Sequence, residues 1–150
     1  MPQSLTNILV HLVFGTKKRE NYLTNEVCHR LYPYISSILK SSNCECIKIG
    51  GIENHIHILC ALAKTTSISD LIEKIKSSTS KWIKTNDESF AHFRWQKGYG
   101  AFSISPAHLQ IVNKYINNQS AHHKQTTFED EFRALLKKYN VQHDERYLWD

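Results

Sequence analysis

The order of apolar patterns along the chain predicts an α+β fold of the ferredoxin-like, split β-α-β kind. This is a sandwich in which a four-stranded antiparallel sheet has helices on one face, with further C-terminal helices. Segments rich in β-branched and aromatic residues alternate with segments whose apolar residues recur every three or four positions, in the order β-α-β-β-α-β. The 150 residues are 41% hydrophobic and 22% charged, which is typical of one compact domain spanning residues 1–150.

The first half of the chain is expected to form a strand, a helix and two further strands. The apolar run at 8–14 ends at a glycine and predicts the first strand. Residues 24–42 have apolar side chains at helical spacing, and Pro33 within them indicates a kink or a later start. Residues 44–49 alternate and stop at Gly50-Gly51, a turn signal, so we expect them to pair as a hairpin with the apolar run 55–62.

The second half is expected to contain a helix, a strand and two more helices. Ser67-Ile-Ser-Asp70 resembles a capping box and opens an apolar stripe that reaches Ile83, which predicts the second helix. The alternating segment 99–105 predicts the fourth strand. Ser105-Pro106 is a typical helix start, for a helix reaching about Gln119 or Ser120, and a last helix is expected over 127–139.

Charge and composition indicate a partner that carries phosphates. Lys and Arg number 19 against 14 Asp and Glu, a net charge of +5, and Phe, Trp and Tyr make up 11% of the chain. Candidate contacts to a DNA backbone, which are otherwise solvated cations, are Lys17, Lys18, Arg19, Lys74, Lys81 and Lys84. No apolar run is long enough to span a membrane, no signal segment opens the chain, and four cysteines are too few for a secreted disulfide scaffold. We therefore expect reduced thiols, a cytoplasmic protein and no membrane partner.

The motif His55-Ile56-His57 lies on a predicted strand. Because strand side chains alternate between faces, both imidazoles point the same way and Ile56 points into packing. Two neutral imidazoles side by side form half of a metal site. The alternative is a pair of exposed strand histidines without a ligand.

Tyr115 and Gln119 are four residues apart on the helix that Ser105-Pro106 starts, so they share one helical face. A tyrosine can act as a nucleophile towards phosphorus, and a glutamine oxygen is a hard ligand suited to Mg²⁺ or Mn²⁺. The alternatives are a packing aromatic for Tyr115 and a solvated helix end for Gln119.

Four ordered blocks of the sequence resemble the HUH superfamily of single-strand DNA nucleases, and within it the IS200-like, single-tyrosine transposases of small bacterial insertion sequences. The blocks are Gly51-Ile-Glu-Asn-His-Ile-His-Ile-Leu59, Ser67-Ile-Ser-Asp-Leu-Ile-Glu-Lys-Ile-Lys-Ser77 with Trp82, Trp95-Gln-Lys-Gly-Tyr-Gly-Ala-Phe-Ser103 and Lys114-Tyr-Ile-Asn-Asn-Gln119. Asn54 departs from the pattern, because many relatives carry Asp before the first histidine.

The resemblance implies a DNA transposase that cleaves and rejoins single-stranded DNA at insertion-sequence ends. It assigns His55, His57 and Gln119 as ligands of Mg²⁺ or Mn²⁺ and Tyr115 as the nucleophile that forms a 5′-phosphotyrosine. It also implies hairpin DNA as the partner, and a homodimer in which the tyrosine acts at the partner's metal.

Other readings of the same residues stay open. One is an inactive or domesticated protein of the same fold that binds single strands or hairpins. A zinc site could combine Cys44 and Cys46 with His55 and His57. His122-His123 could shuttle a proton or contact phosphate, although a solvated pair is the favoured interpretation. A phosphodiesterase with two His-x-Ser/Thr motifs is disfavoured, because the single His-x-His motif ends in histidine.

Overall fold

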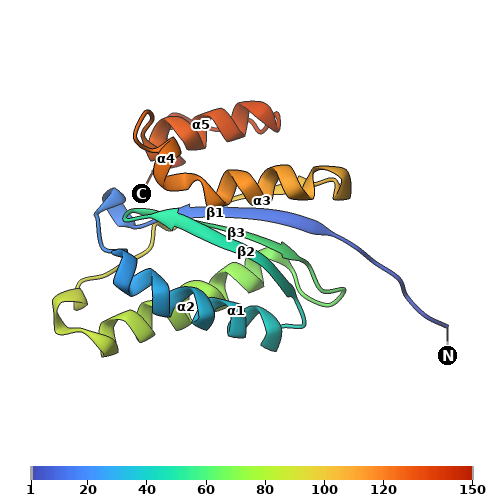
Figure 1. The fold of residues 1–150 in the computed structure, drawn as a ribbon, viewed down its shortest axis with the longest axis horizontal. Coiled ribbons are helices and arrows are strands. Elements are labelled where there is room, and N and C mark those ends of the chain that lie inside the picture. The colour runs from blue at the N-terminus through green and yellow to red at the C-terminus, as the bar shows by residue number, and fades with distance from the viewer. Residues whose placement is uncertain (1, 150) are drawn as a thin grey trace.

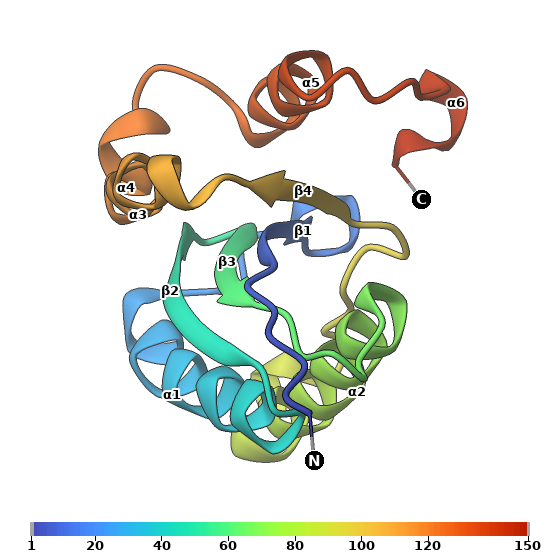
Figure 2. The same cartoon turned by 90° about the vertical axis from the view of Figure 1, so that its right-hand side faces the viewer.

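The computed structural model describes residues 2–149 and has a four-stranded antiparallel sheet between two layers of helices (Figures 1 and 2). The strands are β1 (Leu9–Gly15), β2 (Glu45–Ile52), β3 (His55–Ala61) and β4 (Gly100–Ile104). They lie in the order β2-β3-β1-β4, and every neighbouring pair is antiparallel. The predicted α+β fold and the β2–β3 hairpin are therefore confirmed.

Helices cover both faces of this sheet. One face carries α1 (Asn25–Ser41) and α2 (Ile68–Asn86), and the opposite face carries α3 (Leu109–Asn117), α4 (Gln119–His122) and α5 (Phe128–Lys138) (Figure 1). The C-terminal helices thus form a second layer of their own. The short helices are η1 (Lys17–Arg19), η2 (Glu88–Phe90), η3 (Pro106–His108) and α6 (Glu145–Leu148). Within residues 2–149, none of the helices has the length and apolar character needed to cross a bilayer.

Apolar side chains fill the space on both sides of the sheet. The larger core joins Leu12 and Phe14 of β1 and Ile56 of β3 to α1 and α2. On the other face, Val13 and Phe102 pack against α5, and Leu9 and Leu59 pack against α3. Because both faces are covered, β1 and β3 are buried along almost their whole length, and their residues other than His11, His55 and His57 are apolar or glycine.

Local sequence signals place most helix starts correctly. The side chains of Thr24, Ser67 and Thr127 each accept a hydrogen bond from a backbone N–H in the first turn of α1, α2 and α5. Pro33 lies inside α1, which begins at Asn25, so the expectation of a later start was wrong. α6 was not predicted.

The glycine pair was misread as a turn. Gly50 and Gly51 lie inside β2, and the hairpin turn is formed by Glu53 and Asn54. A Cβ at Gly50 would lie 2.6 Å from the carbonyl oxygen of Ile116 in α3. The glycine is therefore needed because α3 crosses β2 closely, rather than because the chain reverses.

Candidate active site

His55 and His57 lie side by side on β3, on the face covered by α3, α4 and α5. Both side chains are fully buried, and Ile56 between them points into the core on the other face. Nδ1 of His55 donates to the side-chain oxygen of Asn54 at 2.8 Å. Its Nε2 lies 2.8 Å from Oε1 of Gln119. The strand thus places both imidazoles as the alternation of side chains predicted.

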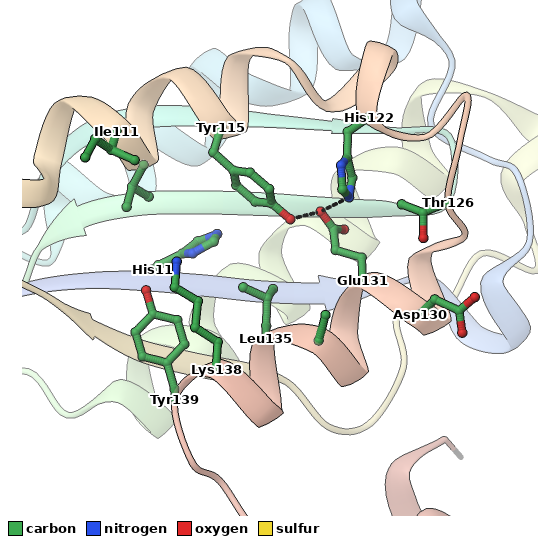
Figure 3. Close-up of a pocket in the computed structure, with 12 residues that line it drawn as sticks. His11, Ile111, Tyr115, His122, Thr126, Asp130, Glu131, Leu135, Lys138 and Tyr139 are labelled. Atoms are coloured by element: carbon green, nitrogen blue, oxygen red, sulfur yellow. Dashed lines mark hydrogen bonds and ion pairs between the residues drawn. The ribbon is translucent and has the colours of Figure 1, made fainter.

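Tyr115 and Gln119 reach the same site from a helix that is interrupted. The single helix expected from Ser105 is divided into η3, α3 and α4, with Asn118 outside helical geometry between α3 and α4. Both side chains nevertheless face the histidines. The Tyr115 hydroxyl donates to Glu131 (Figure 3). Nε2 of Gln119 donates to Oε2 of Glu131 at 2.8 Å.

Glu131 of α5 is the centre of the site, and sequence reasoning missed it. Its side chain is 1% exposed, and its Oε1 lies 3.2 Å from Nε2 of His55 and 3.2 Å from Nε2 of His57. A signal was present, because Phe128, Glu131, Phe132 and Leu135 share the spacing of one buried helical stripe. A carboxylate on such a stripe needs buried partners.

The His122-His123 pair is not the solvated pair that was expected. His123 is 4% exposed in its side chain, its Nδ1 donates to the carbonyl of Thr126 at 2.8 Å, and its Nε2 lies 3.0 Å from Oε1 of Glu131. His122 is about one-third exposed and approaches Oε2 of Glu131 at 3.4 Å. Both rings therefore border the site.

A further histidine lies behind the site. Nε2 of His11 on β1 is 2.7 Å from Nδ1 of His57. Burial, aided by the nearby His57, lowers the pKa of His11 to about 3. Burial also lowers the pKa of His55 to about 4, against the opposing effect of Glu131. Both rings are therefore neutral near pH 7, the form in which an imidazole can offer a lone pair to a metal.

The carboxylate and the phenol have opposite protonation states. Burial alone would raise the pKa of Glu131, but the adjacent imidazoles of His123, His55 and His57 outweigh it and hold the pKa well below its usual range. Burial and the adjacent carboxylate raise the pKa of Tyr115. Glu131 is thus an anion, and Tyr115 keeps its proton and donates a hydrogen bond to that anion.

A cavity of about 350 Å³ opens beside Tyr115, between α3 and α5 (Figure 3). Ile111 and Leu135 give it apolar walls, whereas His11, Lys138 and Tyr139 contribute polar groups. The Tyr115 side chain therefore borders an open space and is not enclosed by the fold.

The cysteines lie away from this site. Cys44 and Cys60 are part of the core under α1 and α2, on the opposite face of the sheet from His55 and His57. In residues 2–149, the side-chain groups spaced to hold a metal are His55, His57 and Glu131, and His122, His123 and Glu131. The zinc alternative with Cys44 and Cys46 is therefore wrong.

The candidate DNA-binding cations divide into two groups. Lys17, Lys18 and Arg19 form η1 directly after β1, and a surface hollow joins Lys18 and Arg19 to Asn54 and His123 at the edge of the site. The second group lies on α2, across the sheet from Tyr115, and consists of Lys74, Lys81 and Lys84. Of the two groups, η1 is the one that lies at the edge of the site.

Comparison with known proteins adds the family. The model of the family "Transposase IS200 like" matches residues 4–119. The ISDra2 transposase TnpA of Deinococcus radiodurans is 22% identical over 114 residues, covering 73% of this chain and 81% of that protein.

Two solved structures share the fold. A putative transposase from Deinococcus radiodurans R1 has a TM-score of 0.62 at 19% identity and covers 79% of this chain and 98% of its own. A REP-associated tyrosine transposase bound to a REP hairpin has a TM-score of 0.61 at 14% identity, and the match covers 84% of this chain and 74% of that transposase.

Proposed function

Because the chain belongs to the family of IS200-like transposases, we propose that it cleaves and rejoins single-stranded DNA at the ends of an insertion sequence, with Tyr115 as the nucleophile. One observation carries the proposal. Tyr115, His55, His57 and Gln119 converge on one buried carboxylate within a single chain. Such a convergence supports joint chemistry better than it supports packing, because it buries five polar groups in one place.

The donor set fits a hard divalent cation. Gln119 offers an amide oxygen, the kind of ligand that Mg²⁺ and Mn²⁺ take, and His55 and His57 offer buried neutral imidazoles, which are ligands of first-row transition metals, the class to which Mn²⁺ belongs. Such an ion would polarise the scissile phosphate and withdraw charge from it. Asn54 accepts from His55 and fixes the orientation of that ring, so the departure from the usual Asp keeps the contact.

The chain itself supplies the nucleophile and its orientation. The hydrogen bond to Glu131 aims the Tyr115 hydroxyl at the space between α3 and α5. Attack forms a bond from the phenol oxygen to phosphorus and breaks the bond from phosphorus to the 3′ oxygen. The phenol loses its proton and the leaving 3′ oxygen takes one up, so the products are a 5′-phosphotyrosine and a 3′-hydroxyl. One phosphodiester replaces another, and no nucleotide fuel is consumed.

The partner that this reaction needs is single-stranded DNA, folded as a hairpin. A solved structure of similar fold has a REP hairpin bound, and the cations of η1 border the site here. Joining two DNA ends takes two tyrosines, and each chain has one at this site, so we infer a homodimer. We place the reaction in the cytoplasm, with the element's own DNA as its substrate.

The arrangement within one chain bears on whether Tyr115 attacks DNA held at the metal site of its own chain or at that of the partner. Tyr115 lies beside the histidines of its own chain, with Glu131 between them. This geometry supports cleavage within one chain, in contrast to the partner-site arrangement that the family resemblance implied.

A covalent adduct tests the function. Labelled single strands from both flanks of the gene are incubated with the protein and Mg²⁺ and then run on a denaturing gel. We expect a protein–DNA adduct with the wild type and none with Tyr115→Phe, because that change keeps the ring and removes the nucleophile. Tyr139→Phe is the matched control, since Tyr139 lines the same cavity and should leave the adduct unchanged. Hairpin binding without any adduct from the wild type would instead indicate a binding protein.

A further inference from the structure

We propose that Glu131 is a fourth protein ligand of the metal ion, beside His55, His57 and Gln119. The inference rests on the proposed function and adds a residue from outside the segment that carries the family match. That match ends at residue 119, whereas Glu131 is in α5. The C-terminal layer would then complete the metal site as well as cover the sheet.

Hydrogen-atom accounting around His55 supports a cation at this point. A neutral imidazole has one N–H, and His55 uses it at Nδ1 to donate to Asn54. Its Nε2 is then a bare lone pair, 2.8 Å from the amide oxygen of Gln119 and 3.2 Å from Oε1 of Glu131. Neither oxygen carries a hydrogen to donate, because the amide hydrogens of Gln119 are on its nitrogen. Nε2 of His123 lies 2.9 Å from the Gln119 oxygen and 3.0 Å from Oε1 of Glu131, so it can supply a hydrogen to these oxygens. It supplies none to Nε2 of His55, and the lone pair on that nitrogen still faces two oxygens, an arrangement that a cation between the three atoms would stabilise.

The separations of these atoms match the first coordination shell of Mg²⁺ or Mn²⁺. With metal–ligand bonds of about 2.1 Å in an octahedron, neighbouring ligand atoms lie about 3.0 Å apart. Oε1 of Glu131 is 3.2 Å from Nε2 of His55 and 3.2 Å from Nε2 of His57. The carboxylate therefore already lies at the spacing of a ligand and would need no large movement to serve as one.

Packing holds the carboxylate in this position. Phe128, one turn before Glu131, stacks on the ring of His55 with centroids 4.1 Å apart, and Phe132 packs in the same core as Val13. His123 approaches Oε1 from the other side at 3.0 Å. α5 is thus fixed on the histidines by apolar contacts that do not depend on the ion.

The two oxygens of the carboxylate face different partners. Oε1 faces His55 and His57, whereas Oε2 accepts from the Tyr115 hydroxyl and from Gln119. Glu131 therefore links the ion to the nucleophile through one rigid group. Four protein ligands leave about two of six positions for a phosphate oxygen and water.

Metal affinity provides the test without any need for DNA cleavage. We would titrate the full chain with Mn²⁺, following free Mn²⁺ by electron paramagnetic resonance, for the wild type, Glu131→Gln and Glu131→Ala. Loss of the carboxylate should weaken Mn²⁺ binding at least about tenfold, and the neutral glutamine oxygen should restore little of it. Glu129→Gln is the matched control on the same helix, because its side chain is 35% exposed and lies outside the histidine cluster.

The outcomes separate this inference from the proposed function. Equal Mn²⁺ affinity of Glu131→Gln and wild type would overturn the inference and leave the transposase proposal standing. Absence of Mn²⁺ and Mg²⁺ binding by the wild type would overturn both the inference and the metal dependence. If both Glu131 variants fail to fold, anomalous scattering from a wild-type crystal soaked in Mn²⁺ shows whether Glu131 contacts the ion. An ion within about 2.3 Å of a Glu131 oxygen supports the proposal, and an ion bound only by the other three residues contradicts it.

Discussion

Substituting Gly50 by alanine tests whether the close crossing of α3 over β2 positions Tyr115, the proposed nucleophile. A Cβ at this position would lie 2.6 Å from the carbonyl oxygen of Ile116 and 2.7 Å from its Cγ2, whereas ordinary contacts begin near 3.4 Å. α3 must therefore move away by about 0.8 Å. Overpacking of this kind costs about 1–3 kcal/mol, and about 2 kcal/mol lowers Tm by about 4–8 °C in a domain of this size.

The same displacement should slow the chemistry, because Tyr115 precedes Ile116 on α3. A misplacement near 1 Å can reduce a rate by about a hundredfold, so adduct formation should fall by about tenfold or more. Thermal unfolding by circular dichroism and the denaturing-gel assay measure the two effects. Gly98→Ala is the control, since the nearest atom to a Cβ there is 3.9 Å away. If Gly50→Ala keeps the Tm and the adduct rate of Gly98→Ala, the crossing is not as tight as described.

Two further outcomes concern the metal and the DNA. Chelation of divalent ions should abolish the adduct, and His57→Ala should remove most of it while hairpin binding survives; an adduct formed in excess chelator would refute the ligand assignment. Hairpin affinity should fall with salt by about 0.7 in log K per log unit of salt for each phosphate contacted. Lys18→Ala, at the edge of the site, should reduce the slope of log K against log salt by about 0.7, whereas Lys81→Ala, on α2 across the sheet, should leave it unchanged. Equal effects of the two substitutions would show that the DNA does not bind beside η1 as proposed.

Local signals in the sequence were sufficient for most of the fold. The strand patterns, the cap at Ser67 and the β2–β3 hairpin each depend on residues that lie close together in the sequence, and the structure agrees with them. Gly50 could not be read correctly, because its requirement arises from Ile116, 66 positions later in the chain. A glycine that is needed because a helix packs closely against it cannot be distinguished, from a single sequence, from a glycine that is needed for a turn.

The site was predictable only in the part that lies within motifs. His55 and His57 were found from strand alternation, and Tyr115 and Gln119 from helical spacing and family resemblance. Glu131 was missed, because it stands beside Glu129 and Asp130 in the first turn of α5, where acidic residues ordinarily favour the helix dipole. His11 was missed because its partner, His57, is 46 residues away.

The register of β3 in the sheet determines on which face His55 and His57 lie, and therefore whether the candidate site forms. His57 pairs with Val13 on one side and Gly50 on the other, and His55 pairs with Gly15 and Ile52. A slip of one residue would turn both imidazoles into the core of α1 and α2 and bring Ile56 and Ile58 to face Glu131. Each imidazole buried without a partner would cost about 1–3 kcal/mol, and the carboxylate would lose its donors as well. A one-residue slip of β3 would therefore remove the histidines from the site and Ile56 and Ile58 from the core at the same time, so the same error would cost both the site and stability.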